Sequence, residues 1–158
     1  MSSIPVTVRG AQMMRDELQR LKTKDRYEVI AAIAEARSHG DLSENAEYEA
    51  AKERQAFIEG RIAELESKLS SAQIIDPKTL NTNGRIVFAA TVSLEDLETG
   101  EKVRDQIVGN DEADLKEMKI SITSPLARAL IGREAGDVVE VNAPAGVREY
   151  EILDVLFI

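Results

Sequence analysis

The feature that most constrains the fold is a long stretch that almost lacks helix-breaking residues. No proline occurs between Pro5 and Pro77, and the glycines within residues 11–83 are Gly40 and Gly60. The remaining positions are rich in Ala, Glu, Lys, Arg, Leu and Gln, which favour helices. The stretch therefore predicts two long helices that are separated near Gly40.

Each of these two arms carries a row of seam residues at helical spacing. In the first arm the seam positions are Met14, Leu18, Leu21, Asp25, Val29, Ile33 and Ala36. In the second arm they are Tyr48, Ala51, Gln55, Ile58, Ile62, Leu65, Leu69 and Ala72. The spacings alternate between three and four, as in a coiled coil, except for a 4-4 step through Asp25.

Either arm alone is a marginal helix in water, so the two seams must be buried on each other or on a partner. A short turn at Gly40 predicts an antiparallel coiled-coil hairpin within residues 1–76. Arms of roughly 30 residues give a rod about 45 Å long, with the turn at its far end. Gly60 is costly in a helix, and close approach of the two arms is one explanation for it.

The second half of the chain changes to period-two patterns. After a linker at 77–83, residues 84–158 predict five strands at 85–94, 102–109, 118–123, 137–143 and 147–158. A short helix starts between the third and fourth strands, with Ser124 as N-cap, Pro125 in the first turn and Gly132 after its end. This order predicts an α+β domain with a largely antiparallel β-sheet and one short helix.

Composition excludes several classes of function. The 158 residues carry a formal net charge of −9, which argues against broad binding to nucleic acid. No cysteine is present, so disulfides and thiolate metal sites are unavailable. No apolar run approaches the roughly 18 residues of a membrane span, so we expect a soluble cytoplasmic protein without membrane contact.

The predicted turn, HGDLSENAEYE at residues 39–49, is unusually acidic. One interpretation is a capping box, with Asp41 as N-cap and Glu44 at N3, that stabilises the second helix by about 1 kcal/mol. Ser43 is a rival N-cap. The other interpretation is that Asp41 and Glu44, three positions apart on one helical face, supply part of the oxygen shell of a Mg²⁺ ion. The spacing is compatible with both.

Five segments together form a more specific pattern. They are AAIAEARSHGDLSENAEYEAAKERQ (31–55), EGRIAELESKLSSAQIID (59–76), NGRIVFAATV (83–92), IVGNDEADLKEMKISITSPLARALIG (107–132) and GDVVEV (136–141). This pattern resembles the Gre transcript-cleavage factors of bacteria over essentially the whole chain. The resemblance implies an N-terminal coiled-coil hairpin followed by a C-terminal FKBP-like domain.

The resemblance also implies a function in transcription elongation. Proteins of this kind bind RNA polymerase through its secondary channel and stimulate the polymerase's own endonucleolytic cleavage of backtracked nascent RNA. The factor is then not itself an enzyme. Asp41 and Glu44 correspond to the acids that act in the polymerase active site on a shared Mg²⁺, and the free protein holds no Mg²⁺ stably.

The resemblance assigns roles to five further residues. Arg37 and Lys52 form a small basic patch that contacts the 3′ segment of the RNA, although both also suit a solvated helix surface. Ile120, Ser124 and Pro125 contact the polymerase rim, although Ser124 and Pro125 are also explained by the helix start. The remaining motifs suggest no site.

The run Asp111–Asp114 is interpreted as a solvated loop, and a hairpin that buries its own seam predicts a monomer.

Three other functions compete with that of a cleavage factor. A related protein could enter the same channel and inhibit polymerase without stimulating cleavage. A coiled-coil adaptor with purely capping acids and a free-standing Mg²⁺ hydrolase are the other two.

Overall fold

The computed structural model describes residues 3–38 and 45–158. They divide into two compact units, one within residues 11–72 and one formed by residues 3–10 together with 73–158. Within the described ranges, no helix is both long and apolar enough to cross a membrane.

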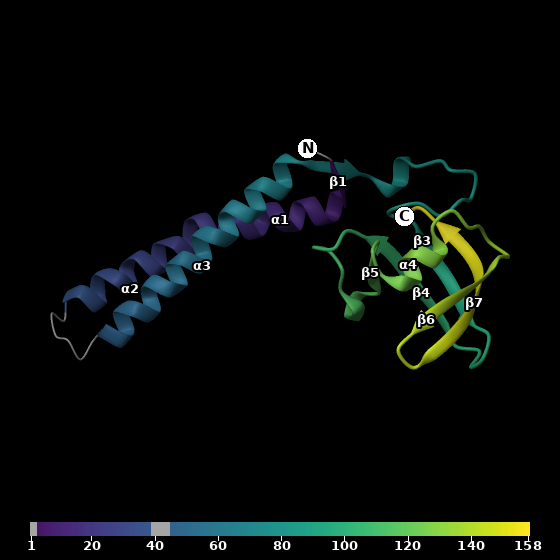
Figure 1. Cartoon of the computed structure of the whole chain (residues 1–158). Coiled ribbons are helices and arrows are strands. Elements are labelled where there is room, and N and C mark those ends of the chain that lie inside the picture. Colours follow the sequence, from purple (N-terminus) through teal and green to yellow (C-terminus); the bar gives the residue numbers. More distant parts are fainter. Residues whose placement is uncertain (1–2, 39–44) are drawn as a thin grey trace. The chain divides into compact units, whose positions relative to one another are not determined.

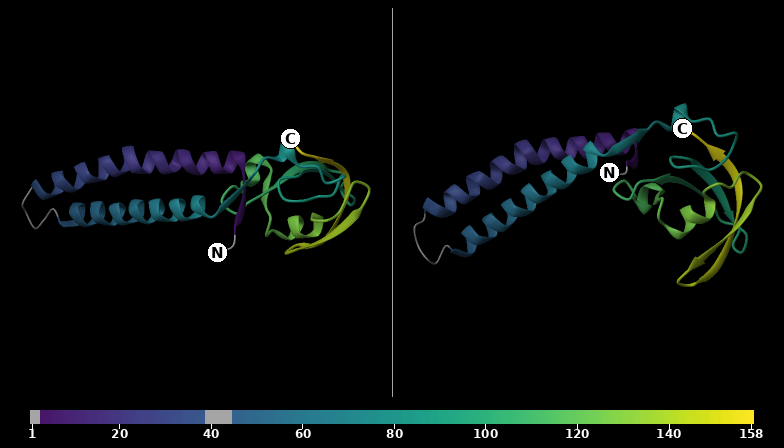
Figure 2. Two further views of the ribbon diagram at one scale, coloured as in Figure 1. Left: turned by 90° about the horizontal axis from the view of Figure 1, so that it is seen from above. Right: turned by 45° about the horizontal axis from the view of Figure 1, so that its top comes forward.

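The first unit is a hairpin of two helical arms (Figure 1). The first arm consists of α1 (Val8–Arg20), the π-helical turn η1 (Leu21–Asp25) and α2 (Arg26–Ser38). The second arm is α3 (Asn45–Ser70). The arms lie side by side in both views of Figure 2, which confirms the predicted hairpin.

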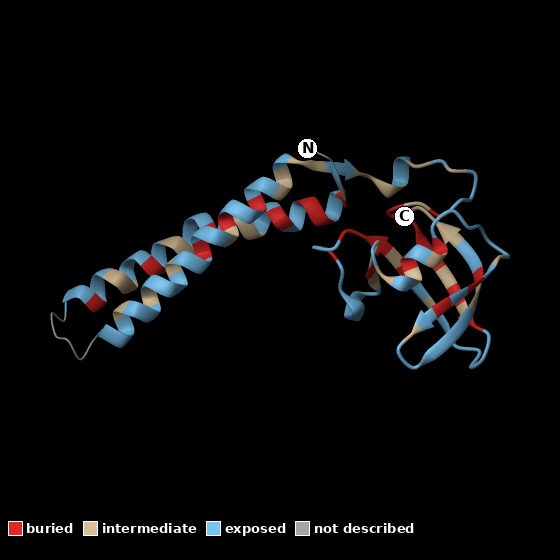
Figure 3. Cartoon of the chain, viewed as in Figure 1, coloured by how far each residue is buried: buried red, intermediate tan, exposed pale blue. Residues whose placement is uncertain are grey.

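The facing sides of the arms are buried (Figure 3). The buried apolar side chains of the two arms are those of Ala11, Met14, Leu21, Val29, Ala36, Ile58, Ile62 and Leu65. All of them except Ala11 are predicted seam positions. The alternation of three and four residues therefore identified the core of the hairpin correctly.

The 4-4 step in the first seam coincides with the π-helical turn. Leu21 and Asp25 bound this turn, and α-helix resumes at Arg26. A π turn accommodates one more residue than an α turn, so the extra position is absorbed locally and the seam is recovered at Val29. Asp25 is half-buried there and pairs with Arg20 at 3.7 Å.

Gly60 does not mark a close approach of the two arms. It is exposed on α3, and a Cβ atom built on it meets no other atom within 4 Å. The explanation by close packing of the helices is therefore wrong.

The second unit is built around a five-stranded sheet. Its strands are β3 (Thr91–Asp96), β4 (Lys102–Val108), β5 (Lys119–Ser121), β6 (Val138–Ala143) and β7 (Gly146–Leu156). Their order is β5-β4-β3-β7-β6, and each pair is antiparallel except β4 and β5, which are parallel. A second, two-stranded sheet pairs β1 (Ile4–Thr7) with β2 (Ala72–Ile75), which the sequence had not suggested.

Helix α4 (Pro125–Leu130) packs on the large sheet and closes its core. Ser124 caps it by accepting a hydrogen bond from the Ala127 amide at 3.3 Å, as predicted. Gly132 follows the helix with a positive φ of 84°. The core beneath the helix contains Ile86, Ala90, Val92, Leu94, Ile107, Ile120, Ala127, Leu130, Val139 and Ile152.

The first predicted strand of this domain, 85–94, begins only at Thr91. Ala89 has a positive φ of 78°, which interrupts an extended chain at that point. Ile86 instead exchanges backbone hydrogen bonds of 2.8 Å with Gly132 and Arg133 after α4. The apolar residues at the start of the segment therefore fill the core from an irregular segment.

Candidate functional site

The two acids on which the sequence argument centres, Asp41 and Glu44, lie outside the described residues, as does His39. The described chain ends on one side at Ser38, the last residue of α2, and resumes at Asn45, the first residue of α3. The structure therefore fixes the two helix ends that flank this connection.

Arg37 and Tyr48 connect the two arms next to the acids. The Arg37 guanidinium lies over the Tyr48 ring, 5.9 Å from its centroid. Arg37 is exposed and Tyr48 is half-buried. A cation–π contact at such a site contributes about 0.5–1 kcal/mol. Tyr48 was predicted from the seam, but its contact with Arg37 was not, and it gives the candidate RNA-contacting arginine a defined position.

Lys52, the second candidate for the basic patch, is exposed on α3. Its ammonium donates a hydrogen bond to Gln55 Oε1 at 3.3 Å on the same helix. Arg54 pairs across the hairpin with Glu28 at 3.8 Å. Arg37 and Lys52 thus occupy the described ends of opposite arms, as the sequence predicted, and each has a different contact.

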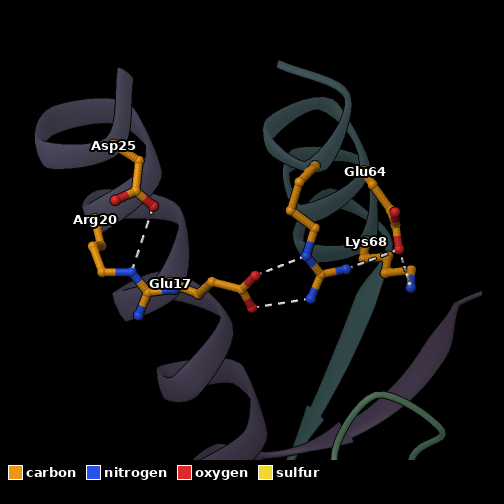
Figure 4. A network of polar contacts seen from close by, with 6 residues as sticks. Glu17, Arg20, Asp25, Glu64 and Lys68 are labelled. Carbon is orange, nitrogen blue, oxygen red and sulfur yellow. Dashed lines mark hydrogen bonds and ion pairs between the residues drawn. The ribbon is translucent and has the colours of Figure 1, made fainter. Parts of the chain in front are cut away.

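Ion pairs between the arms hold the register of the hairpin. Glu17 accepts two hydrogen bonds from Arg61, at 2.7 and 2.9 Å (Figure 4). Arg26 makes the same two-pronged contact with Glu59, at 2.8 and 2.7 Å. A planar guanidinium facing a carboxylate fixes geometry as well as charge, so these two pairs oppose sliding of one arm along the other.

The arginines also shift the titration of their partners. Hydrogen bonding from Arg61 lowers the pKa of Glu17, against the opposing effect of its partial burial. Hydrogen bonding from Arg26 lowers the pKa of Glu59 in the same way. Both carboxylates are therefore held in the charged form that the ion pairs need.

Figure 4 shows that the contacts continue along each arm. Glu64 accepts from both Arg61 and Lys68, at 2.9 Å in each case, and these contacts lower its pKa, with Lys68 the larger cause. On the other arm Arg20 reaches Asp25 at the π turn. The hairpin surface is thus a set of local charge pairs, and among the described residues no group of three or more acidic, His or Cys side chains has a metal-binding arrangement.

The three residues predicted to contact polymerase differ in their exposure. Ile120 is 7% exposed and belongs to the core under α4, so its side chain packs the domain. Ser124 is half-buried and caps α4, and Pro125 is exposed. Ser124 and Pro125 are therefore the members of this set that offer surface to a partner.

Sequence reasoning missed Glu112, which is one of the most constrained polar residues in the sheet unit. It lies in the run that was interpreted as a solvated loop, yet it is 5% exposed. Its carboxylate accepts hydrogen bonds from the amides of Thr7, at 3.0 Å, and Gly109, at 3.1 Å, and from the Thr7 hydroxyl. Thr7 Oγ1 in turn accepts from the amide of Gly10 at 3.0 Å.

This cluster builds the start of α1. Thr7 precedes the first helical residue and caps the helix through Gly10, while Glu112 holds Thr7. Gly10 leaves room for the carboxylate, because a Cβ atom there would overlap the Glu112 side chain. The spacing of Thr7 and Gly10 at the helix start was a sequence signal for the N-cap. Nothing in the sequence linked this cap to position 112.

Two exposed apolar side chains lie in and just after the short helix η4 (Leu115–Glu117) in the same unit. Leu115 is 80% exposed and Met118 is 50% exposed. Met118 also has a left-handed backbone, with φ of 57°. The segment that precedes β5 therefore presents apolar surface in the same unit as α4.

Comparison with known proteins assigns both halves of the chain. Residues 4–74 match the family described as transcription elongation factor, N-terminal, and residues 81–157 match transcription elongation factor, GreA/GreB, C-terminal. The chain is 66% identical to transcription elongation factor GreA of Neisseria meningitidis serogroup A and 65% identical to that of Ralstonia nicotianae, with full coverage of both proteins in each case.

A solved structure, the GreA factor homolog 1 (Gfh1) protein of Thermus thermophilus, is 32% identical over 97% of this chain and 98% of its own, with a TM-score of 0.44. The family matches span nearly all of the sequence, and the two GreA proteins align with it from end to end. The chain therefore belongs to the GreA/GreB family of transcription elongation factors.

Proposed function

We propose that this chain rescues arrested RNA polymerase by stimulating the polymerase's own cleavage of backtracked nascent RNA, and that it is not itself a nuclease. The observation that supports the proposal is the position of Asp41 and Glu44 in the sequence. They lie in the connection between α2 and α3, whose arms are held in register by the Glu17–Arg61 and Arg26–Glu59 pairs. Because these pairs fix the offset between the arms, the ends of α2 and α3 that flank the two acids are held in register.

The donor set suits Mg²⁺ but is incomplete. Two carboxylates provide hard oxygen ligands, whereas Mg²⁺ takes six in near-octahedral geometry. Asp41 and Glu44 would hold the ion together with groups of the polymerase, and the free protein would bind it weakly. The ion so held supplies Lewis-acid activation of water for hydrolysis. The other contributions of this chain to RNA cleavage are contacts that its side chains make with the RNA and the polymerase.

Arg37 and Lys52 are positioned to meet the RNA. Both are exposed, one at the end of α2 and one near the start of α3. The Tyr48 ring supports the Arg37 guanidinium, so the cation is partly pre-ordered for a phosphate of the 3′ segment. Lys52 acts as a flexible point charge beside it.

The sheet unit binds the polymerase at the edge formed by Ser124 and Pro125. The exposed Leu115 and Met118, which precede β5, offer further apolar surface in the same unit. Such a composition, an apolar centre with polar neighbours, is typical of protein interfaces. The factor works in the cytoplasm as a monomer, since the hairpin buries its own seam.

The test uses a stalled, backtracked polymerase complex that carries 3′-labelled RNA, with Mg²⁺ and the purified factor. Short labelled fragments are expected with polymerase present and not with RNA and factor alone. Asp41→Asn keeps the capping ability of the residue but is a poorer Mg²⁺ ligand. Mutation of a group that only orients a metal ligand lowers metal affinity or activity by about 10- to 100-fold. Loss of a ligand itself should therefore lower the cleavage rate of Asp41→Asn at least about tenfold.

Glu49→Gln is the matched control, because it removes one exposed carboxylate from the same end of α3. It should cleave at the wild-type rate. Wild-type cleavage by Asp41→Asn would refute the metal-binding role. Inhibition without fragments would identify a channel-binding inhibitor, and cutting of free RNA would identify a hydrolase.

A further inference from the structure

A cavity of about 460 Å³ lies in the sheet unit, and none of the residues that line it belongs to α4. Its walls come from the end of β1, the first residues of α1, the short helix η3 (Pro77–Thr79) with Asp76 before it, strands β4 and β5, and Ile158. Its volume falls within the range of roughly 300–1,000 Å³ that is usual for small-molecule sites. The family role described above makes no use of it.

Three cations from distant parts of the sequence line this cavity. They are Arg9 in the first turn of α1, Lys78 in η3 and Lys119 at the start of β5. Asp76 is the one acidic side chain among the lining residues. In a chain with a formal net charge of −9, this local excess of positive charge is unusual.

The contacts of these groups leave positive charge available to a ligand. The Asp76 carboxylate accepts from the Lys78 amide at 3.0 Å and so caps η3. The Lys119 ammonium donates to the neutral Gln106 amide oxygen at 3.2 Å. Within the described part of the chain, the Lys78 ammonium has no hydrogen bond or ion pair. Arg9 pairs with Glu117 at 2.6 Å, but this acid is itself half-exposed and can yield to a ligand.

The chemistry of the lining selects an anion over other ligands. Lysines bind phosphate as mobile point charges, and an arginine presents a planar fork to phosphate oxygens. No aromatic side chain lines the cavity, so it offers no stacking surface for a base. Cations gathered in one cavity also suit a compact anion better than a long nucleic-acid backbone, which needs a continuous basic track.

We propose that this cavity binds a small molecule through a di- or triphosphate group, with Arg9, Lys78 and Lys119 as its ligands. The proposal is independent of the role of the hairpin acids in RNA cleavage. The phosphate group could belong to free pyrophosphate or to a nucleoside triphosphate, and binding by both with similar affinity would show that the phosphates alone are recognised.

The test titrates the full-length factor with sodium pyrophosphate, ATP and a short single-stranded RNA, following amide NMR shifts. Pyrophosphate should shift the amides of residues 7–9, 78 and 119. Lys78→Gln and Lys119→Gln should each weaken binding about tenfold, since each removes a charge-assisted contact. Lys102→Gln is the control, because it removes the same charge from β4 outside the cavity, and it should bind as the wild type does.

Four results would overturn the proposal. One is the absence of saturable shifts with pyrophosphate and ATP, and a second is a set of shifts confined to other residues. An equal loss in Lys102→Gln would show a general charge effect, and tighter binding of RNA at the same amides would reassign the cavity to nucleic acid. Thermal unfolding of each variant at the wild-type temperature excludes misfolding as the cause of lost binding.

Discussion

Gly10 and Gly60 both lie inside helices, yet alanine is expected to affect the protein in opposite directions at the two positions. In a helix interior alanine is favoured over glycine by about 1 kcal/mol. At Gly60 in α3, a new Cβ meets nothing within 4 Å, so Gly60→Ala should realise that gain. Gly10 in α1 has no such space, because a Cβ there overlaps Cγ, Cδ and Oε1 of Glu112.

To relieve the overlap, Glu112 has to leave the amides of Thr7 and Gly109. Each buried N–H that loses its partner costs about 1–3 kcal/mol, so the two together cost roughly 2–6 kcal/mol. After subtraction of the helix-propensity gain, Gly10→Ala should lose roughly 1–5 kcal/mol. The same chemical change thus destabilises one helix and stabilises the other.

The assay is hydrogen exchange with mass spectrometry on peptides that cover residues 3–10 and 105–112. A local probe is preferable, because a chain of two units need not unfold in a single step. Gly10→Ala should speed exchange in both peptides, and Gly60→Ala should slow exchange in α3. In a Glu112→Ala background the clash is gone, so the penalty of Gly10→Ala should vanish. An unchanged penalty in the double mutant would refute the reasoning.

Two predictions concern pH. Asp105 lies on the same face of β4 as the core-facing Val103 and Ile107, and burial raises its pKa. Its charged form therefore destabilises the fold above that raised pKa and not below 3.8. Asp105→Asn should stabilise the sheet unit at pH 7, and urea titrations should show this gain shrinking as the pH falls toward 3.8. Glu17 has a lowered pKa, so its pair with Arg61 contributes fully above 4.5 and is lost as the pH falls through the lowered value. Glu17→Gln should lower the free energy of unfolding by about 1 kcal/mol at pH 7, which is more than the effect of Glu66→Gln. The difference between Glu17→Gln and the wild type should disappear in acid. A difference that does not depend on pH would contradict a contribution from the charged Glu17–Arg61 pair.

The hairpin could be predicted because its information is local. A seam such as Ile58, Ile62 and Leu65 records helix period and buried face in the same residues. The sequence also indicated an irregularity at the π turn, because the 4-4 step through Asp25 departs from the seam spacing. A helix can absorb such a step in only a few ways. The explanation of Gly60 by close approach of the two arms was wrong, because it depended on the distance between two helices. The residue pattern of one helix does not contain that distance.

The sheet unit was predictable in outline and less so in detail. Alternation located β4, β6 and β7, but apolar residues before Thr91 resembled strand although Ala89 turns the chain away. The pairing of β1 with β2 brings together residues about 70 positions apart, and four-residue strands carry too little pattern to announce this.

Glu112 shows the same limit for the polar residues. Its neighbours Asp111 and Asp114 are exposed, and the local sequence is that of a charged loop. What buries Glu112 is a set of amide donors supplied by Thr7 and Gly109, one of which is more than 100 residues away. A carboxylate whose partners are backbone groups leaves no complementary charge in the sequence by which it could be found.

The π turn at Leu21–Asp25 has a consequence for how the length of the first arm can vary. Leu21 and Val29 are eight residues apart, and removal of one residue between them would leave seven, the repeat of an ordinary heptad. Most single-residue deletions inside a coiled coil rotate everything beyond them off the seam. Here the deletion would convert the π turn into an α turn and keep the seams on both sides in phase. The first arm can therefore lose one residue within Leu21–Asp25 without losing its register with the second arm.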